Sequence, residues 1–204
     1  MLHRAAFLPL FFISAVLSSA VLSSATFSPI QDAFAGQPLT LKAGSALVEF
    51  KAVGRPSLLK IPGKSTQLEV KLEREDSGAL KGSFEFPLDT LETGIGLRDS
   101  HMKEKYLETA KFPTAKLEIT DASVPPAFFS QESGEQMITV KGSLTLHGVT
   151  KPVELQARLV REGKGFTSES AFKLMLTDYG ISIPKYLGIV IAEDVDVKIR
   201  FTAE

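Results

Sequence analysis

The chain has 204 residues, which is enough for one domain and hardly enough for two. Its 23 lysines and arginines nearly balance 24 aspartates and glutamates, so it lacks the basic excess typical of nucleic-acid-binding proteins. The sequence has no tryptophan and no cysteine, and the lack of cysteine excludes disulfides, cysteine catalysis and thiolate metal sites. We therefore expect neither a nucleic-acid partner nor a cysteine-bound cofactor.

The first 35 residues have the pattern of a secretory signal peptide. A short basic start precedes an apolar stretch over residues 5–17, and small residues follow it. Cleavage is expected after Ala35, where Ala-Phe-Ala has the form that a signal peptidase reads, or after Ala25. The apolar stretch is also long enough for an uncleaved membrane anchor, but the downstream Ala-x-Ala favours export. The sequence thus predicts a signal peptide, a domain over residues 36–204 and a periplasmic location.

Alternation of apolar and polar residues with a period of two dominates the rest of the chain, as expected for strands with one buried face. Short glycine-containing connections separate several of these runs and indicate antiparallel hairpins. The eight predicted strands cover residues 47–53, 68–73, 80–88, 115–119, 138–146, 153–159, 172–176 and 195–201. One helix of about two turns is predicted near residues 99–108, with Asp99 or Ser100 as its N-cap. Met102 and Tyr106 are spaced so that they contact each other on one face of this helix.

Eight antiparallel strands can stack as a sandwich or curl into a barrel, and closure into a barrel removes exposed edges. Gly82 and Gly142 fall on the apolar faces of their strands, where glycine permits a sharp bend or a close backbone approach. The chain also has 14 phenylalanines, several of them in the predicted strands. These rings either fill a core or line a dry tube for a long apolar guest, and composition does not distinguish the two.

The residues offer little catalytic or metal-binding chemistry. No Gly-x-Ser-x-Gly motif occurs, and neither His101 nor His147 has neighbours at the spacing of zinc ligands. His101 stands in a polar cluster with Arg98. A surface or helix-packing histidine that hydrogen-bonds Asp99 or a backbone carbonyl is favoured over a catalytic base. Asp194 and Asp196 resemble an acidic metal motif, but they alternate with apolar residues and are expected on the solvated face of a strand. We therefore expect no metal.

Five segments carry a resemblance to the YceI-like family. Residues 98–101 read Arg-Asp-Ser-His, similar to the Arg-Asp-x-His signature of the family. Residues 111–115 read Lys-Phe-Pro-Thr-Ala and resemble the family's Phe/Tyr-Pro-Thr start of a strand. Residues 142–153 resemble its Gly-x-Leu-Thr-x-x-Gly-Val-Thr-x-Pro-Val hairpin, and residues 178–181 and 195–199 also match.

The resemblance covers about residues 40–203 and implies an all-β fold, an eight-stranded antiparallel lipocalin-like barrel with one short helix near its mouth. It also implies a non-enzymatic protein without cofactor that binds, transports or sequesters a polyisoprenoid or another long acyl-chain lipid. Residues 102–107 depart from the family pattern, because many relatives have a shorter segment with paired phenylalanines. We therefore expect a differently shaped mouth, carry over no particular ligand, and leave a homodimer open.

Two sets of residues are expected to hold such a lipid. The polar or anionic head is expected at the mouth near Arg98, His101 and Lys103, because the planar guanidinium of Arg98 suits phosphate or carboxylate. The alternative role for Arg98 is a salt bridge to Asp99 or Glu104 that only fixes the helix. The tail is expected among inward-facing residues of the strands, namely Val70, Phe84, Phe86, Leu144, Leu155, Phe172 and Val197.

Two other functions are kept as alternatives. An enzyme acting on an isoprenoid lipid would use His101 as its general base and Arg98 as an anion clamp. A barrel or sandwich with a filled interior would instead serve as an interaction module of the cell envelope. An internal cavity distinguishes lipid binding from this last alternative.

Overall fold

The structure, a computed structural model, describes residues 37–39, 46–55, 59–186 and 188–203. The signal peptide predicted over the first 35 residues lies outside them. No helix within the described ranges is long and apolar enough to cross a membrane.

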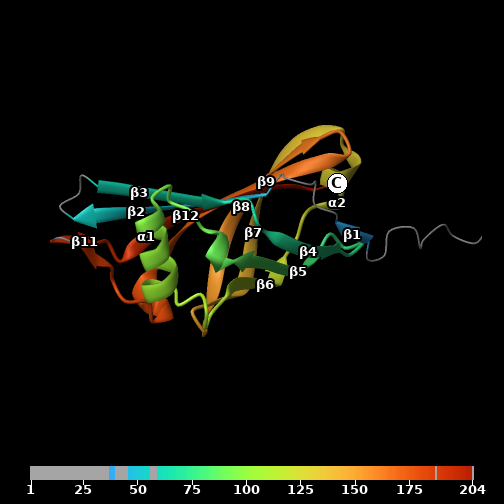
Figure 1. The fold of residues 1–204 in the computed structure, drawn as a ribbon. Helices are drawn as coiled ribbons and strands as arrows, with labels where there is room; N and C mark the ends of the chain where they lie inside the picture. The colour runs from blue at the N-terminus through green and yellow to red at the C-terminus, as the bar shows by residue number, and fades with distance from the viewer. Residues whose placement is uncertain (1–36, 40–45, 56–58, 187, 204) are drawn as a thin grey trace, which may run out of the picture. The chain divides into compact units, whose positions relative to one another are not determined.

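Twelve strands form one curled antiparallel sheet in this part of the chain (Figure 1). Their order across the sheet is β1-β4-β5-β6-β7-β8-β9-β12-β2-β11-β10, and β3 also pairs with β2. The strands are β1 (Gln37–Leu39), β2 (Leu47–Arg55), β3 (Leu59–Ser65), β4 (Glu69–Arg74), β5 (Leu80–Pro87), β6 (Thr114–Ala122), β7 (Ser133–Leu146), β8 (Val149–Glu162), β9 (Gly165–Met175), β10 (Lys185–Tyr186), β11 (Ile189–Ile191) and β12 (Asp194–Ala203).

Short helical segments interrupt this succession of strands. They are the 3-10 turns η1 (Leu88–Thr90) and η3 (Leu176–Tyr179), the helices α1 (Gly96–His101) and α2 (Pro126–Ser130), and the π-helix η2 (Met102–Tyr106). Figure 1 shows α1 and α2 at opposite ends of the curled sheet. The two ends of the interior are therefore covered by different pieces of chain.

The predicted all-β class is confirmed, and each of the eight predicted strands coincides with a strand of the sheet. The count differs, because β1, β3, β10 and β11 were not predicted. Three of these strands have only two or three residues. The fourth, β3, contains Pro62 and Gly63, which weaken the strand pattern and suit an edge strand.

The predicted helix is present, but it begins earlier than expected and has a different start. The N-cap is Ile95, whose side chain makes no capping hydrogen bond, and α1 runs directly into η2. Asp99 is thus not the N-cap. Its carboxylate instead accepts a hydrogen bond from the Thr93 backbone N–H at 2.8 Å, which ties the first turn to the preceding segment. The structure also contains α2, a second short helix that was not predicted.

One pair of backbone hydrogen bonds brings the two sides of the sheet together. The Lys64 N–H donates to the Glu92 carbonyl at 2.9 Å, and the Glu92 N–H donates to the Lys64 carbonyl at 3.0 Å. Lys64 belongs to β3 on one side of the sheet, and Glu92 follows η1 and β5 on the other. The sheet therefore curls far enough to enclose an interior.

Two glycines permit a close approach of neighbouring strands. Gly82 of β5 and Gly142 of β7 both lie opposite Ile119 of β6, so the three residues form one row across the sheet. A Cβ atom on Gly82, whose φ is +142°, would lie 1.9 Å from the Lys71 carbonyl oxygen. A Cβ atom on Gly142 would lie 2.5 Å from the Glu118 carbonyl oxygen. Neighbouring backbones thus approach each other here more closely than any side chain allows.

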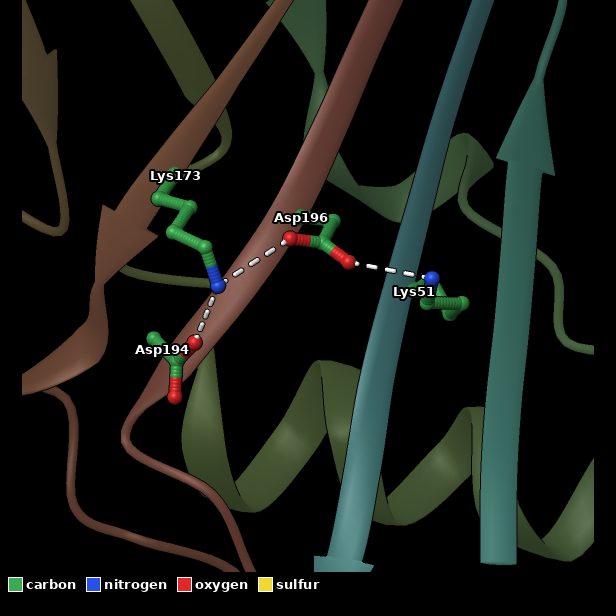
Figure 2. Close-up of polar contacts among 4 residues, drawn as sticks. All are labelled: Lys51, Lys173, Asp194 and Asp196. Atoms are coloured by element: carbon green, nitrogen blue, oxygen red, sulfur yellow. Dashed lines mark hydrogen bonds and ion pairs between the residues drawn. The ribbon is translucent and has the colours of Figure 1, made fainter.

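Charged residues cover the outer face of β9, β12 and β2 (Figure 2). Lys173 Nζ lies 2.6 Å from Asp194 Oδ2 and 3.4 Å from Asp196 Oδ1, and Lys51 Nζ lies 3.1 Å from Asp196 Oδ2. The prediction that both aspartates lie on the solvated face of their strand is confirmed. Such exposed ion pairs contribute little stability, so the fold depends on the interior.

The interior contains two apolar clusters. The larger cluster lies towards α2, where the rings of Phe128, Phe166 and Phe201 follow one another with centroids 6.3 and 6.4 Å apart. Phe84 continues this row, 5.5 Å from Phe201. The smaller cluster gathers residues from β2, β5, η1 and the segment after η3 and packs against Met102 of η2. At the α2 end the rings fill the curl.

We predict that Gly82→Ala lowers the free energy of unfolding by roughly 2 kcal/mol or more, because the new methyl group meets the Lys71 carbonyl in a strained backbone conformation. Urea denaturation of purified protein measures the change. The matched control is Gly96→Ala, since nothing lies within 4 Å of a Cβ atom on Gly96. Equal stability of the two variants would contradict this account of the close approach.

Candidate functional site

The α1 end of the curled sheet encloses a cavity of about 610 Å³. This volume is within the range of typical small-molecule sites, about 300–1,000 Å³. Strands β2, β3, β5, β6, β7, β9, β11 and β12 contribute inward-facing side chains, and α1 and η2 cover the same space. The alternation of β12 is a clear example, because Val195, Val197 and Ile199 face the cavity while Asp194 and Asp196 face solvent.

The cavity wall is almost entirely apolar, and its polar residues are few. They are Thr93, Arg98, His101, Lys105, Tyr106 and Lys185. All but Lys185 come from the segment that contains α1 and η2, and no aspartate or glutamate is among the lining residues. The site is therefore an apolar hollow with positive charge at one end.

The helical segment presents one face to the hollow. Arg98, His101, Met102 and Lys105 line the cavity at helical spacing. Lys103 falls between these positions and is not among the lining residues. Met102 and Tyr106, the pair that the sequence pattern placed together, both line the cavity from η2.

The structure brings two of the three predicted head-group residues to the cavity. Arg98 and His101 line it, and Lys103 does not. Lys105 and Lys185 were not predicted. Helical periodicity offers a signal for Lys105, which lies two turns after Arg98. No local sequence pattern marks Lys185, because β10 reaches the cavity only through the fold of the whole sheet.

Five of the seven predicted tail residues line the cavity. They are Phe84, Phe86, Leu144, Phe172 and Val197. The other two, Val70 and Leu155, face the interior as predicted but pack in the larger apolar cluster at the filled end. Both predicted arrangements therefore occur in the same sheet: side chains fill the interior at one end and line a cavity at the other. Phe84 belongs to both regions.

Arg98 is held by hydrogen bonds to Thr93. Its Nε donates to Thr93 Oγ1 at 2.7 Å and one Nη donates to the Thr93 carbonyl at 2.8 Å. The Thr93 hydroxyl in turn donates to the Asp99 carboxylate. Within the described residues Arg98 forms no ion pair with Asp99 or Glu104. Its guanidinium has five N–H donors, so this arrangement leaves donors available towards the cavity.

The Asp99 carboxylate is stabilised in its ionised form. Burial raises its pKa, and hydrogen bonds from the Thr93 hydroxyl and backbone N–H oppose this effect. The positive charges of Lys103 and Arg98 act in the same direction, and the pKa lies below its usual range. Lys103, which does not line the cavity, is thus close enough to Asp99 for its charge to favour the ionised carboxylate.

A second contact holds the far end of the helical cover. His147 Nε2 lies 2.8 Å from Glu108 Oε2, just beyond η2, and its Nδ1 lies 3.1 Å from the Tyr179 carbonyl oxygen. The Phe112 ring packs against the imidazole with a centroid distance of 4.4 Å. His147 therefore joins the η2 segment to the β7–β8 hairpin and to η3, and its role is structural.

The arrangement suits the retention of an amphiphile. Among the described residues, no group of three or more histidines, aspartates or glutamates is placed to hold a metal ion. His101 is exposed at the edge of the cavity, and no hydrogen-bond partner orients it in the part of the chain that the structure describes. The wall offers dispersion contacts and burial along its length, and charge only at its end.

We predict that Ala115→Leu and Ala157→Leu differ in stability, although both alanines point into the barrel. Ala115 lines the cavity and has room for added carbons, whereas Ala157 is 4% exposed and packs in the filled cluster. Overpacking at Ala157 is expected to cost about 1–3 kcal/mol, and Ala115→Leu less than about 0.5 kcal/mol. Chemical denaturation of both variants gives the comparison. Equal losses would show that no hollow exists.

We predict that Asp99→Ala lowers the free energy of unfolding by roughly 1–2 kcal/mol at neutral pH, because the Thr93 donors lose a charged acceptor. A carboxyl group whose pKa is lowered in the folded state stabilises the protein above its unfolded pKa, about 4, and loses that contribution as the pH falls further. The stability difference from the wild type should therefore shrink below about pH 4. Urea unfolding at several pH values measures it, and a difference that grows in acid would refute the assignment.

The sequence is similar to those of known protein families and curated proteins. A model of the YceI-like domain matches residues 40–203. A UPF0312 protein of Pseudomonas syringae pv. syringae is 36% identical over 115 residues, which cover 52% of this chain and 55% of that protein. A UPF0312 protein of Shewanella oneidensis is 27% identical over 178 residues, 82% of this chain and 87% of that protein. The chain spans about half the length of several of the curated relatives that it matches.

Solved structures show the same fold at low identity. A polyisoprenoid binding domain from Saccharophagus degradans, implicated in plant cell wall breakdown, superposes with a TM-score of 0.64 at 19% identity and covers 82% of this chain and 97% of that domain. BcnA of Burkholderia cenocepacia gives a TM-score of 0.62 at 13% identity, with 77% and 96% covered. Because the family model spans most of the sequence, the chain belongs to the YceI-like family.

Proposed function

We propose that this chain binds a long-chain amphiphile, with an isoprenoid or similar apolar tail in the cavity and an anionic head at the cationic end. The observation that carries the proposal is the apolar hollow of about 610 Å³ whose charged lining residues are all cations and lie at one end. A tail and a charged head need these two environments side by side. The description of the Saccharophagus degradans relative as a polyisoprenoid binding domain supports the same class of ligand.

The apolar wall supplies the free energy of binding. Each CH₂ group moved from water into an apolar environment contributes about 0.8 kcal/mol, so a tail of ten carbons gains about 8 kcal/mol before the costs of association. Those costs are of order 4–15 kcal/mol, which favours tails considerably longer than ten carbons. Phe84, at the inner limit of the cavity, marks where the tail would meet the filled cluster.

The cationic end supplies selectivity for the head. Arg98 has donors left after its two bonds to Thr93, and a guanidinium pairs well with phosphate or carboxylate. Lys105 and Lys185 add positive charge from η2 and β10, and no described carboxylate forms an ion pair with either lysine. A neutral head would offer these cations no opposite charge.

Retention, transport or sequestration fits this site better than catalysis. The exposed imidazole of His101 has no described partner to set its orientation, as an effective general base requires. The pattern of the first 35 residues supports a periplasmic location. In an aqueous compartment a long tail needs a protein that shields it from water. We therefore propose a non-enzymatic carrier of the cell envelope.

We predict that purified protein binds a prenyl phosphate more tightly than the prenyl alcohol of equal chain length. Arg98→Met removes the charged donors and keeps an apolar side chain, so it should lower affinity for the phosphate by about 10–100-fold relative to the alcohol. Displacement of a fluorescent hydrophobic probe measures both affinities. The ratio of the two affinities is the informative quantity, because a disturbed helix would weaken the binding of both ligands equally.

Two control variants complete this experiment. Arg158→Met removes an arginine from the outer face, where it pairs with Glu135, and should change neither affinity. Ala115→Phe occupies the cavity and should weaken both ligands by about tenfold or more. Failure of the wild-type protein to bind any prenyl chain would overturn the proposed function.

A further inference from the structure

Large apolar side chains lie exposed where the cavity meets the surface. Ile95 and Leu97, at the start of α1, are 54% and 64% exposed, and Leu59, at the start of β3, is 39% exposed. These three are half of the six exposed large apolar residues among those described, and all three line the cavity. We call Leu59, Ile95 and Leu97 the apolar rim.

Folding gathers the rim with the tips of the sheet. Both β3 and β11 pair with β2 at Gly54. A Cβ atom on Gly54 would lie 3.2 Å from Leu59 Cβ and 2.7 Å from Ile189 Cγ2, so the side chains of Leu59 and Ile189 meet above this glycine. Ile95 and Leu97 approach the same opening from the helical cover. The three rim residues therefore come from separate parts of the chain, and all of them line the same cavity while remaining exposed.

The charged residues that line the cavity beside the rim are all cations. Arg98, Lys105 and Lys185 line the same opening, and no acidic residue is among the lining side chains. Exposed apolar side chains beside lysines and arginines match an anionic bilayer surface, where the apolar groups enter the interface and the cations meet lipid phosphates. This complementarity favours a lipid surface as the partner.

We propose that the apolar rim docks the opening of the cavity onto an anionic membrane. Docking deepens the proposed function and gives it a route, because a tail that leaves the bilayer directly into the cavity never crosses water. A protein partner is less suited to this rim, since stable interfaces bury about 800 Å² on each side and the rim consists of three side chains.

Vesicle flotation tests the docking with the protein in its exported form, because the apolar signal peptide predicted over residues 1–35 would itself bind vesicles. The wild type should bind vesicles that contain phosphatidylglycerol more tightly than pure phosphatidylcholine vesicles, and high salt should reduce the difference. Leu97→Ser should weaken binding to anionic vesicles by about tenfold. Lys185→Gln should weaken it by about fivefold and leave the weak binding to neutral vesicles unchanged.

Matched controls lie at other places on the molecule. Met137→Ser changes a residue of β7 that is 51% exposed and outside the cavity lining, and Lys164→Gln changes an exposed lysine in the β8–β9 turn. Neither should alter vesicle binding. Equal effects of Leu97→Ser and Met137→Ser would overturn the docking, as would a wild type that binds no vesicles.

Further outcomes distinguish membrane docking from self-association of the chain and from the proposed lipid binding. A self-association in ultracentrifugation that Leu97→Ser abolishes, without vesicle binding, would assign the rim to a second copy of the chain and overturn the membrane proposal. The wild type binding a prenyl chain but no vesicles would remove the docking alone. Vesicle binding without any uptake of prenyl chains would instead remove the proposed function.

Discussion

The interior of a curled sheet is reached by every second side chain, and these side chains must either meet one another or leave a dry hollow. At the α2 end Phe128, Phe166 and Phe201 meet and exclude space. At the α1 end the sheet is wider than its side chains can bridge, and α1 with η2 covers the gap. One sheet therefore combines a packed core, which stabilises the fold, with a cavity, where packing contacts between side chains are missing. The row of Gly82, Ile119 and Gly142 makes the curl possible.

The helical cover shows how local contacts shape the site. Thr93 connects Arg98 with Asp99 at the start of the cover, and the Glu108–His147 contact holds the chain just beyond its end. Between these two anchors the cover presents cations to the opening and Met102 to the interior. A polar network thus positions the charged end of an apolar cavity. The same network uses residues of the Arg-Asp-x-His motif, which explains a structural part of that pattern.

Local sequence patterns predicted most of the fold, because period-two alternation survives wherever one face of a strand is buried. They missed β3, where Pro62 and Gly63 interrupt the alternation, and misplaced the helix start, where Ile95 offers no capping side chain. They also placed Lys103 at the cavity, although helical geometry turns it away. Whether a phenylalanine fills the core or lines the cavity depends on residues that are distant from it in the sequence. Phe84 meets Phe201 only after folding, so no local pattern could separate the two ends.

In the proposed function, the hollow at the α1 end holds one long apolar chain. Native mass spectrometry of the protein, purified gently from its own cell envelope, tests it most directly. We expect a population heavier than the polypeptide by the mass of a single long-chain amphiphile, and we expect organic extraction to remove that extra mass. Bare polypeptide in every such preparation, from cells whose membranes contain prenyl chains, would contradict it.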